Sequence, residues 1–458
     1  MAVSQDLKAY WRRLEEERPG EVLRVPGPVR ADFVPTAIAL LAEALPSSPA
    51  LFIEKVDGFD HPVLFNLFGT RERVAWSVGT TPEGFGEKCL KAETQPLPTA
   101  SVPSGPVQEV VCEGKDLDIT QLPILHHFPQ DAGRYVCSGM FLCRDPDTRI
   151  YNLSFQRMQM KGPDHFGTSL GSRGHIWDFF LRQEKRGKPL EVAVIIGAHP
   201  ALYVAAGAEL GMDVDEVAVA GALMGEPVEM VPCKTLDLEV PAQAEFVLEG
   251  ELLPNVREPE GPFNEYTGYI THRSTENVFR TRAVTHRRDA WYLDVIPGYS
   301  SEHLLLGRMA KEAHVFHRLK EMVPTVKAIS WPKSGTHFHA YVSLENTAEG
   351  MARRALMLLF GLDYYLKFAV AVDGDVDVFD EQEVLWAMGT RAQADRDVFI
   401  VPAVFGNRLD PSSPENGTAA KMGVDATVPQ GWDVERVQMP TEVLEEAKRI
   451  LNRPLGNG

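Results

Sequence analysis

A run of strand-like segments between residues 107 and 300, interrupted by short helical ones, most constrains the fold of this 458-residue chain. The segments "RYVCSGMFLCR" and "RIYNLSFQRMQM" are rich in β-formers and joined by the turn "DPDT", which predicts a hairpin. Further strands are predicted in "AEFVLEGELL" and "NVFRTRAVTH", and helices in "HIWDFFLRQEKRG", "HPALYVAAGAEL" and "DVDEVAVAGALMG". Strands with inserted helices favour a partly open barrel over a doubly wound sheet.

Both flanks of this segment mix helices with strands. On the N-terminal side, "FVPTAIALLAEAL" predicts a helix, and "ALFIEKVDG" and "HPVLFNLFG" predict strands. The Pro- and Ser-rich residues 97–106 predict a linker or a domain boundary. On the C-terminal side, "MARRALMLLFG", "KFAVAVDGDVDVF", "DEQEVLWAMGTRA" and "RDVFIVP" predict a helix, strand, helix and strand in a right-handed crossover. The aperiodic residues 405–428 predict a functional loop or disorder.

Charge and composition exclude several classes of protein. Lys and Arg total 46 against 64 Asp and Glu, a net charge of −18, which argues against sequence-independent binding of nucleic acid. No apolar run reaches the roughly 18 residues of a membrane helix, and the N-terminus lacks the apolar region of a signal peptide. The five cysteines contain no C-x-x-C pair, which indicates reduced thiols. We therefore expect a soluble cytoplasmic protein that binds neither nucleic acid nor membrane.

Short motifs taken singly leave alternatives open. The sequence has no H-E-x-x-H and no P-loop. In "THFHAYVSL", His337 and His339 would share one strand face and could bind a metal, although ordinary packing is favoured. "GSRGHIWDFF" places Arg173 and His175 at the first turn of a helix, where backbone N–H groups could hold a phosphate. A structural turn is the alternative there.

In the stretch "REPEGPFNEYTGY", residues 257–269, two of the glutamates, Glu260 and Glu265, lie in neither a helical nor a cleanly alternating pattern. Glu260 and Glu265 are five positions apart around a Gly-Pro pair, beside Phe263 and Tyr266. Two close carboxylates cannot both ionise cheaply, so one pKa rises and that group can act as an acid near neutral pH. The alternative is that both are solvated loop charges.

Five segments in order resemble the UbiD-type decarboxylases, a family that uses prenylated FMN: "YNLSFQRM", "SRGHIW", "DEVAVAGALMGEPVEMVPC", "EGPFNEYTGY" and "AAKMGVDAT". Agreement across five segments, over roughly residues 110–430, is far more specific than any one of them. The resemblance implies a mixed α/β fold with three domains. These would be an N-terminal α/β domain (1–105), a central split β-barrel that binds prenylated FMN (106–305), and a C-terminal α/β oligomerisation domain (306–458).

The same resemblance implies where the ions and the cofactor bind. Asn152, His175 and Glu216 would hold Mn²⁺ against the cofactor phosphate, with K⁺ nearby; their donor atoms form a hard set that suits Mn²⁺ or Mg²⁺. Because Asn152 and Arg157 are an odd number of residues apart, we expect a bulge or a division of roles between strand faces. The cofactor-lining residues implied are Phe155, Gln156, Arg157, Thr168, Ser169, Leu170, Arg173, Gly174, His175 and, from the late loop, Lys421.

The implied reaction is the reversible, non-oxidative decarboxylation of an aromatic, heteroaromatic or α,β-unsaturated carboxylic acid through a covalent cofactor adduct. Arg157 would pair with Glu260 and the incoming carboxylate, and Glu265 would donate the proton. A UbiX-type flavin prenyltransferase would supply the cofactor, and the enzyme would be a homodimer or homohexamer. From its position we expect His303 to face the substrate, with Ser300 and Ser301 as companions.

Two other classes of function remain open from the sequence. One is a metal-dependent hydrolase that uses Glu260 and Glu265 as acid and base without a flavin. The other is a non-catalytic flavin-binding subunit. A visible absorption spectrum separates the first from a flavoenzyme, because a hydrolase would be colourless, and CO₂ release from a carboxylic acid separates the second.

Overall fold

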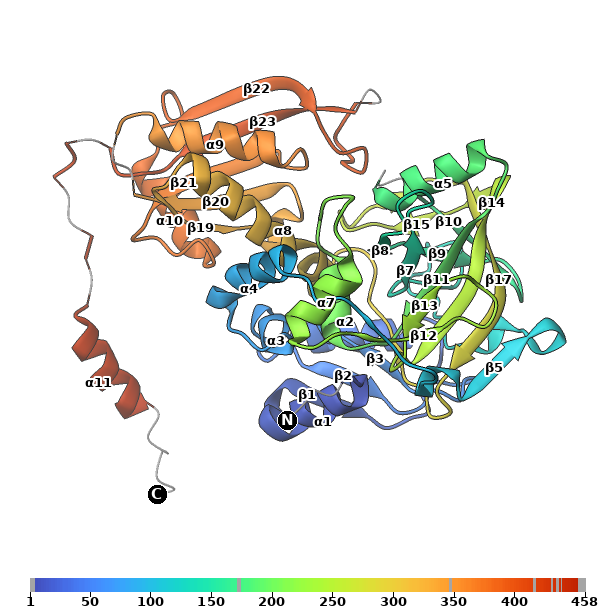
Figure 1. The fold of residues 1–458 in the computed structure, drawn as a ribbon. Coiled ribbons are helices and arrows are strands. Elements are labelled where there is room, and N and C mark those ends of the chain that lie inside the picture. Colours follow the sequence, from blue (N-terminus) through green and yellow to red (C-terminus); the bar gives the residue numbers. More distant parts are fainter. Residues whose placement is uncertain are drawn as a thin grey trace.

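The computed structural model describes residues 5–170, 174–345, 348–414, 417–429, 431–433, 436–437 and 439–451. Figure 1 shows a small N-terminal α/β region beside a strongly curved central sheet, with a C-terminal α/β region packed above them. The mixed α/β class and the central split barrel expected from the sequence are both confirmed.

The N-terminal region is a four-stranded sheet of order β1-β2-β3-β18 with helices around it. One face of the first helix, carrying Leu7, Trp11 and Leu14, is fully buried, as their helical spacing requires. The last strand, β18 (Tyr292–Leu293), comes from far along the chain and pairs in parallel with β3. The elements are α1 (Leu7–Glu17), β1 (Val22–Val25), α2 (Val34–Glu43), β2 (Ala50–Ile53), β3 (Val63–Phe65), α3 (Arg71–Ser77) and α4 (Pro82–Thr94).

The central region contains the predicted hairpin and the three predicted helices. Strands β7 and β8 pair antiparallel across the "DPDT" turn. Its elements are β4 (Ala100–Ser101), β5 (Val110–Glu113), β6 (Tyr135–Val136), β7 (Met140–Arg144), β8 (Tyr151–Phe155), β9 (Met158–Met160), β10 (His165–Thr168), α5 (His175–Lys185), β11 (Leu190–Ile196), α6 (Pro200–Ala206), α7 (Glu216–Met224), β12 (Glu229–Pro232), β13 (Glu239–Pro241), β14 (Phe246–Glu260), β15 (Phe263–Asn264), β16 (Ile270–Thr271) and β17 (Ser274–His286).

The nine-stranded central sheet is curled into a barrel with one split. Its order is β6-β9-β10-β17-β14-β11-β7-β8, with β5 added on β17, so β8 and β9 lie near opposite ends of the sheet. Only residues 156–157 separate β8 from β9 along the chain, and the three peptide steps between the strands span at most about 11 Å. The two ends of the sheet therefore meet across this short connection, which we call the barrel split. Figure 1 shows β14 and β17 as the long, bent strands of the barrel.

The C-terminal region is a five-stranded sheet of order β19-β20-β21-β23-β22 with helices on both faces. Alternate residues of β20 enter different cores, since Ala340 and Val342 pack on the α9 side and Tyr341 on the α10 side. The elements are α8 (Ser301–Met322), β19 (Val326–Ser330), β20 (His339–Leu344), α9 (Met351–Leu362), β21 (Phe368–Asp373), α10 (Glu381–Arg391), β22 (Val398–Phe405), β23 (Thr418–Asp425) and α11 (Thr441–Leu451).

Two expectations for this region are wrong. The predicted crossover between β21 and β22 does not form, because β23 lies between them and β22 runs antiparallel to it; the parallel crossover is β20–α9–β21. Residues 405–428 are also not one irregular loop, since they contain β23. The sequence did not indicate β23 because its small residues are weak β-formers. These residues nevertheless suit a crowded position, since a Cβ at Gly423 would lie 2.3 Å from the Phe399 ring.

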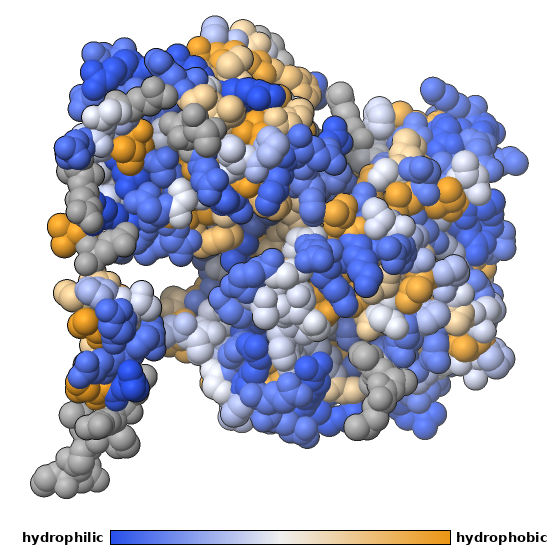
Figure 2. Space-filling model, turned by 60° about the vertical axis from the view of Figure 1, so that its left-hand side comes forward, coloured by the Kyte–Doolittle hydropathy of each residue, from blue (hydrophilic) through white to orange (hydrophobic). Residues whose placement is uncertain are grey.

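Within the described residues, no helix combines the length and apolarity that crossing a bilayer requires. Figure 2 shows a largely hydrophilic face with separate hydrophobic patches, and α11 standing off the body of the protein.

Candidate active site

Three polar side chains from distant parts of the sequence meet beside the barrel. Asn152 lies on β8, while His175 and Glu216 are the first residues of α5 and α7. The Asn152 Nδ2 atom is 3.0 Å from Glu216 Oε1 and 3.4 Å from His175 Nδ1, and His175 Nδ1 is 3.7 Å from Glu216 Oε1. Asn152 and Glu216 are almost fully buried, at 4% and 2% exposure. These residues form what we call the Asn–His–Glu cluster.

This cluster fits a divalent cation. Donor atoms 3.0–3.7 Å apart suit neighbouring ligands of one ion bound at about 2.1 Å. Burial raises the pKa of Glu216, whereas His175 and the backbone N–H of Leu153, which donates to it at 3.2 Å, lower it. Rotation of the Asn152 amide by half a turn would exchange its nitrogen for its oxygen and complete an oxygen–nitrogen–oxygen donor set. The third ligand of such a set would be asparagine, since among the described residues no group of three or more His, Cys, Asp or Glu could hold a metal ion.

A second cluster, which we call the Arg–Glu–Glu cluster, lies at the barrel split. Arg157 sits in the connection between β8 and β9, and two of its nitrogens donate to Glu260 at 3.0 and 2.9 Å. Its Nη1 also donates to Glu265. Glu260 is fully buried and Glu265 is 7% exposed, so the solvated-loop alternative for the two glutamates is wrong. The guanidinium also lies over the Phe263 ring, 4.8 Å from its centroid.

The electrostatics make Glu265 a candidate acid. Burial raises its pKa; Arg157 opposes that effect and Glu260 adds to it. Burial alone would lower the pKa of Arg157, but Glu265 and Glu260 raise it, so the guanidinium stays charged. One cation therefore faces two carboxyl groups, and Glu265 keeps its proton to a higher pH than an exposed glutamate does.

The backbone explains how residues at odd spacing converge. Glu260 is not in an irregular stretch, as the sequence suggested, but is the last residue of β14, opposite Ser274. Gly261, with φ +82°, then starts a turn into the β15–β16 hairpin, whose tip carries Glu265. Neither alternative expected for Asn152 and Arg157, a bulge or a division of roles between strand faces, applies, because β8 ends at Phe155 and Arg157 lies beyond it.

Comparison with known families covers almost the whole chain. Sequence profiles of the 3-octaprenyl-4-hydroxybenzoate carboxy-lyase match in order: its N-terminal domain over residues 14–93, its Rift-related domain over 99–300 and its C-terminal domain over 304–426. The chain belongs to the UbiD family. The resemblance and the enzyme class, a UbiD-type carboxy-lyase, are thus confirmed, and the match begins well before the 110–430 range of the motifs.

Individual relatives are similar along most of their length. The anhydromevalonate phosphate decarboxylase of Methanothermobacter thermautotrophicus is 35% identical over 371 residues, 81% of this chain and 86% of that protein. The UbiD-class enzyme HmfF of Pelotomaculum thermopropionicum, solved with FMN, is 40% identical with a TM-score of 0.92, covering 96% of this chain and 99% of that one. An evolved dimeric form of HmfF, solved with prFMN, is 38% identical with a TM-score of 0.88, covering 95% and 97%.

Most of the cofactor-lining residues implied by the UbiD resemblance lie around the barrel split. The Thr168 hydroxyl at the end of β10 donates to the Arg157 carbonyl at 2.8 Å, and this bond joins the end of β10 to the connection between β8 and β9. Gly174 precedes α5, and Arg173 lies outside the described residues. Lys421 is not on a loop: it is buried on β23, and its ammonium donates to the carbonyls of Tyr364 and Leu366. Of the others, Phe155 is the last residue of β8 and Gln156 follows it, while Ser169 and Leu170 follow β10.

The expected substrate-facing residues start α8. Ser300 is the N-cap, its hydroxyl accepting from the His303 N–H at 3.3 Å and donating to the Ile296 carbonyl at 2.8 Å. Ser301 binds Glu43 through its backbone and side chain, both at 3.0 Å. The His303 ring is half-buried, with Nδ1 2.9 Å from the Gly298 carbonyl oxygen. Both serine hydroxyls thus form hydrogen bonds within the protein at the start of α8. A substrate contact by His303 stays a prediction.

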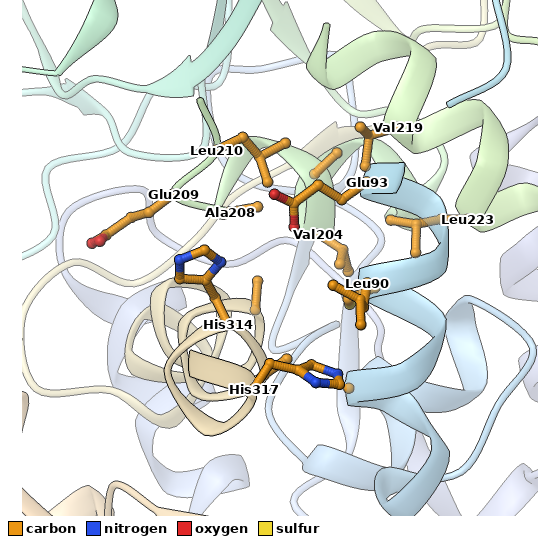
Figure 3. Close-up of a pocket in the computed structure, with 15 residues that line it drawn as sticks. Leu90, Glu93, Val204, Ala208, Glu209, Leu210, Val219, Leu223, His314 and His317 are labelled. Carbon is orange, nitrogen blue, oxygen red and sulfur yellow. The ribbon is translucent and has the colours of Figure 1, made fainter. Parts of the chain in front are cut away.

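The paired histidines of "THFHAYVSL" do not share a strand face. His339 begins β20, whereas His337 precedes the strand and packs its ring against Tyr266, with centroids 4.7 Å apart. Two further histidines, His314 and His317 of α8, line a mostly apolar cavity between α4, α6, α7 and α8. Figure 3 shows both imidazoles projecting from α8 into this cavity, which is separate from the two polar clusters.

Sequence reasoning missed the residues that support the Arg–Glu–Glu cluster. The Tyr135 hydroxyl donates to Glu260 at 3.1 Å, and its ring packs against Phe263 with centroids 4.5 Å apart. Burial raises the pKa of Tyr135, so the phenol stays protonated and remains a donor. Because 125 residues separate Tyr135 from Glu260, no local pattern could have paired them.

Proposed function

We propose that this chain is a reversible, non-oxidative decarboxylase of an aromatic, heteroaromatic or α,β-unsaturated carboxylic acid, with prenylated FMN as its cofactor. The observation that carries the proposal is the arrangement of two polar clusters joined by residues 152–157 at the barrel split. This stretch spans at most roughly 17 Å, so one flavin nucleotide could reach a cation at one end and present its ring system at the other. The FMN and prFMN bound to the similar HmfF structures support this assignment.

In this proposal the Asn–His–Glu cluster holds Mn²⁺, and the cation holds the cofactor phosphate. The first turn of α5 adds backbone N–H groups, since no side chain of the described residues caps this helix. Contacts from Phe155, Gln156, Thr168, Ser169, Leu170 and Lys421, and a K⁺ beside the phosphate, belong to the same proposal.

The Arg–Glu–Glu cluster is proposed to handle the substrate carboxylate and the proton. When bound, prenylated FMN would supply the electron-accepting ring system that allows CO₂ to leave. Glu260 fixes two nitrogens of Arg157, so the guanidinium is held in place to orient the substrate carboxylate. Glu265 then donates its proton to the carbon that has lost CO₂.

The proposal is tested by producing the protein with and without a UbiX-type flavin prenyltransferase. CO₂ release is then measured from benzoic, cinnamic, furan-2-carboxylic and pyrrole-2-carboxylic acids and their hydroxylated derivatives. We expect release from at least one acid class, only from protein that carries the prenylated flavin. Hydrolase activity by colourless protein, or flavin binding without CO₂ release or deuterium exchange for any acid, would contradict the proposal.

The pH dependence of turnover follows from Glu265. A proton donor must be protonated to act, so kcat/KM should fall as the pH rises through the pKa of Glu265, which burial has raised. The fall should therefore begin at a higher pH than an ordinary glutamate would give. The profile is measured on flavin-loaded enzyme with the most active acid of the panel. A rate that rises across that window would assign the proton to another group.

Self-association through the C-terminal region is also proposed, as a homodimer or homohexamer. Strand β22 is an edge strand, and Ile400 and Phe405 on it are 64% and 67% exposed, a surface that favours pairing with another chain. Light scattering at micromolar concentration should show a species larger than the monomer. Ile400→Lys should shift it towards the monomer, whereas Leu41→Lys, at an equally exposed site on α2, should not. A monomeric wild type would contradict this proposal.

A further inference from the structure

Tyr266, the residue after the candidate acid, points away from the barrel and into the C-terminal region. It is 6% exposed. Its ring contacts His337, Phe338 and Tyr365, with centroids 4.7, 5.8 and 6.2 Å away. His337 and Phe338 precede β20, and Tyr365 lies between α9 and β21, so Tyr266 packs where two central strands of the C-terminal sheet begin.

The site that receives the Tyr266 ring, which we call the aromatic site, is formed by His337, Phe338 and Tyr365 and is itself held in place by further contacts. The Lys311 ammonium lies 4.4 Å from the centroid of the Tyr365 ring and forms an ion pair with buried Asp363 at 2.9 Å. The Phe338 carbonyl accepts from the backbone of Lys367 and Phe368 at 2.8 and 3.0 Å. The aromatic site is therefore anchored to α8 on one side and to β21 on the other.

The turn that carries Glu265 is fixed at its base to the central region. The Asn264 N–H donates to Asp131 at 2.8 Å, and the Ala132 N–H donates to the Pro262 carbonyl at 2.8 Å. The turn closes through two backbone bonds, from the Glu265 N–H to the Tyr269 carbonyl at 3.0 Å and from the Gly268 N–H to the Glu265 carbonyl at 2.9 Å. Glu265 thus lies between a base held by the barrel and a tip held by the C-terminal region.

We infer that Tyr266 is a positioning residue that fixes Glu265 against Arg157 by anchoring the tip of this turn in the aromatic site of the C-terminal region. The role of Tyr266 in turnover rests on the proposed role of Glu265 as proton donor. The anchor is the ring and not the hydroxyl, because the buried Tyr266 hydroxyl has no hydrogen-bond partner among the residues that the structure describes. A phenylalanine can therefore replace the tyrosine, whereas an alanine cannot.

The test compares Tyr266→Ala, Tyr266→Phe and Tyr269→Ala with the wild type. Tyr269 belongs to the same turn but is 64% exposed, so its substitution controls for the loss of a ring from the turn. Hydrogen exchange of residues 263–271 in the full chain measures how firmly the turn is held, without any substrate. Turnover and its pH profile are measured at matched flavin content with the most active acid of the panel.

We expect Tyr266→Ala to speed exchange in the turn and to lower kcat, each by at least about tenfold, since small misplacements of a reacting group cost that much or more. The upper limb of its pH profile should move to lower pH, because Glu265 becomes less buried. Tyr266→Phe should restore exchange, rate and profile to within about twofold of wild type, and Tyr269→Ala should change none of them.

Unchanged exchange in Tyr266→Ala, or faster exchange with kcat within about threefold of wild type, would overturn the inference, as would an equal loss in Tyr269→Ala. If the wild type decarboxylates no acid, the proposed function fails. The exchange experiment then decides by itself whether Tyr266 anchors the turn.

Discussion

A Glu265→Gln variant is expected to keep its cofactor and cation but to decarboxylate at least about a hundredfold more slowly, the contribution that general acid catalysis commonly makes. Glutamine preserves the size of the side chain and can still accept the hydrogen bond from Arg157, but it cannot deliver a proton. The bidentate bonds between Arg157 and Glu260 do not involve residue 265, so they should persist. The Asn–His–Glu cluster is likewise formed without it.

The loss is measured as CO₂ release at matched flavin content. Glu258→Gln is the control, because it makes the same chemical change on the partly exposed end of β14 and should leave the rate nearly unaltered. A Glu265→Gln enzyme within about threefold of wild type would move the acid to another group. Glu260 and His303 would then be the next residues to test.

A Glu216→Gln variant is expected to lose its divalent cation and, with it, most of its flavin. Glu216 provides the carboxylate of a cluster whose other members are the neutral Asn152 amide and the His175 imidazole. Without that charge, a buried cation has no anionic protein ligand. Even changes to groups that only support metal ligands commonly weaken binding tenfold to about a hundredfold, and loss of a ligand itself should cost at least as much.

Manganese analysis and the visible flavin spectrum, both taken after gel filtration, measure this loss. Glu249→Gln is the matched control: Glu249 is also fully buried and accepts backbone hydrogen bonds from Lys234 and Thr235 at 2.8 and 2.6 Å, apart from the cluster. The Glu249→Gln variant should retain both the cation and the flavin. Full occupancy of both in Glu216→Gln would show that the ligand has been misassigned.

The sequence predicted elements with strong periodicity and missed those defined by tertiary contacts. The strand predicted in "AEFVLEGELL" and the helix predicted in "HIWDFFLRQEKRG" appear in the structure as the first part of β14 and as α5. Strand β23 escaped notice because Ala, Lys and Gly are weak β-formers, and it forms because it lies between β21 and β22. The order of those strands depends on the whole sheet, so the crossover could not be derived from local patterns.

The candidate site likewise contains residues that the sequence predicted and residues that it missed. Motifs in five segments located Asn152, Arg157 and Glu265, because the chemistry of each depends on its residue type. The residues that hold these groups in place, Tyr135 and Tyr266, make contacts with partners 125 positions away, in Glu260, and 71 positions away, in His337. An ordinary tyrosine in a strand or turn carries no local sign of such a role.

Deuterium incorporation into the product is the most direct test of the central proposal, that prenylated FMN and Glu265 together replace CO₂ with a solvent-derived proton. Enzyme loaded with prenylated FMN, enzyme loaded with plain FMN, and prenylated Glu265→Gln enzyme are each supplied with the most active acid in D₂O. We predict one deuterium at the carbon that carried the carboxylate in the first sample, and at least about a hundredfold less labelled product in the other two. Equal labelling with plain FMN, or from Glu265→Gln, would contradict the proposal.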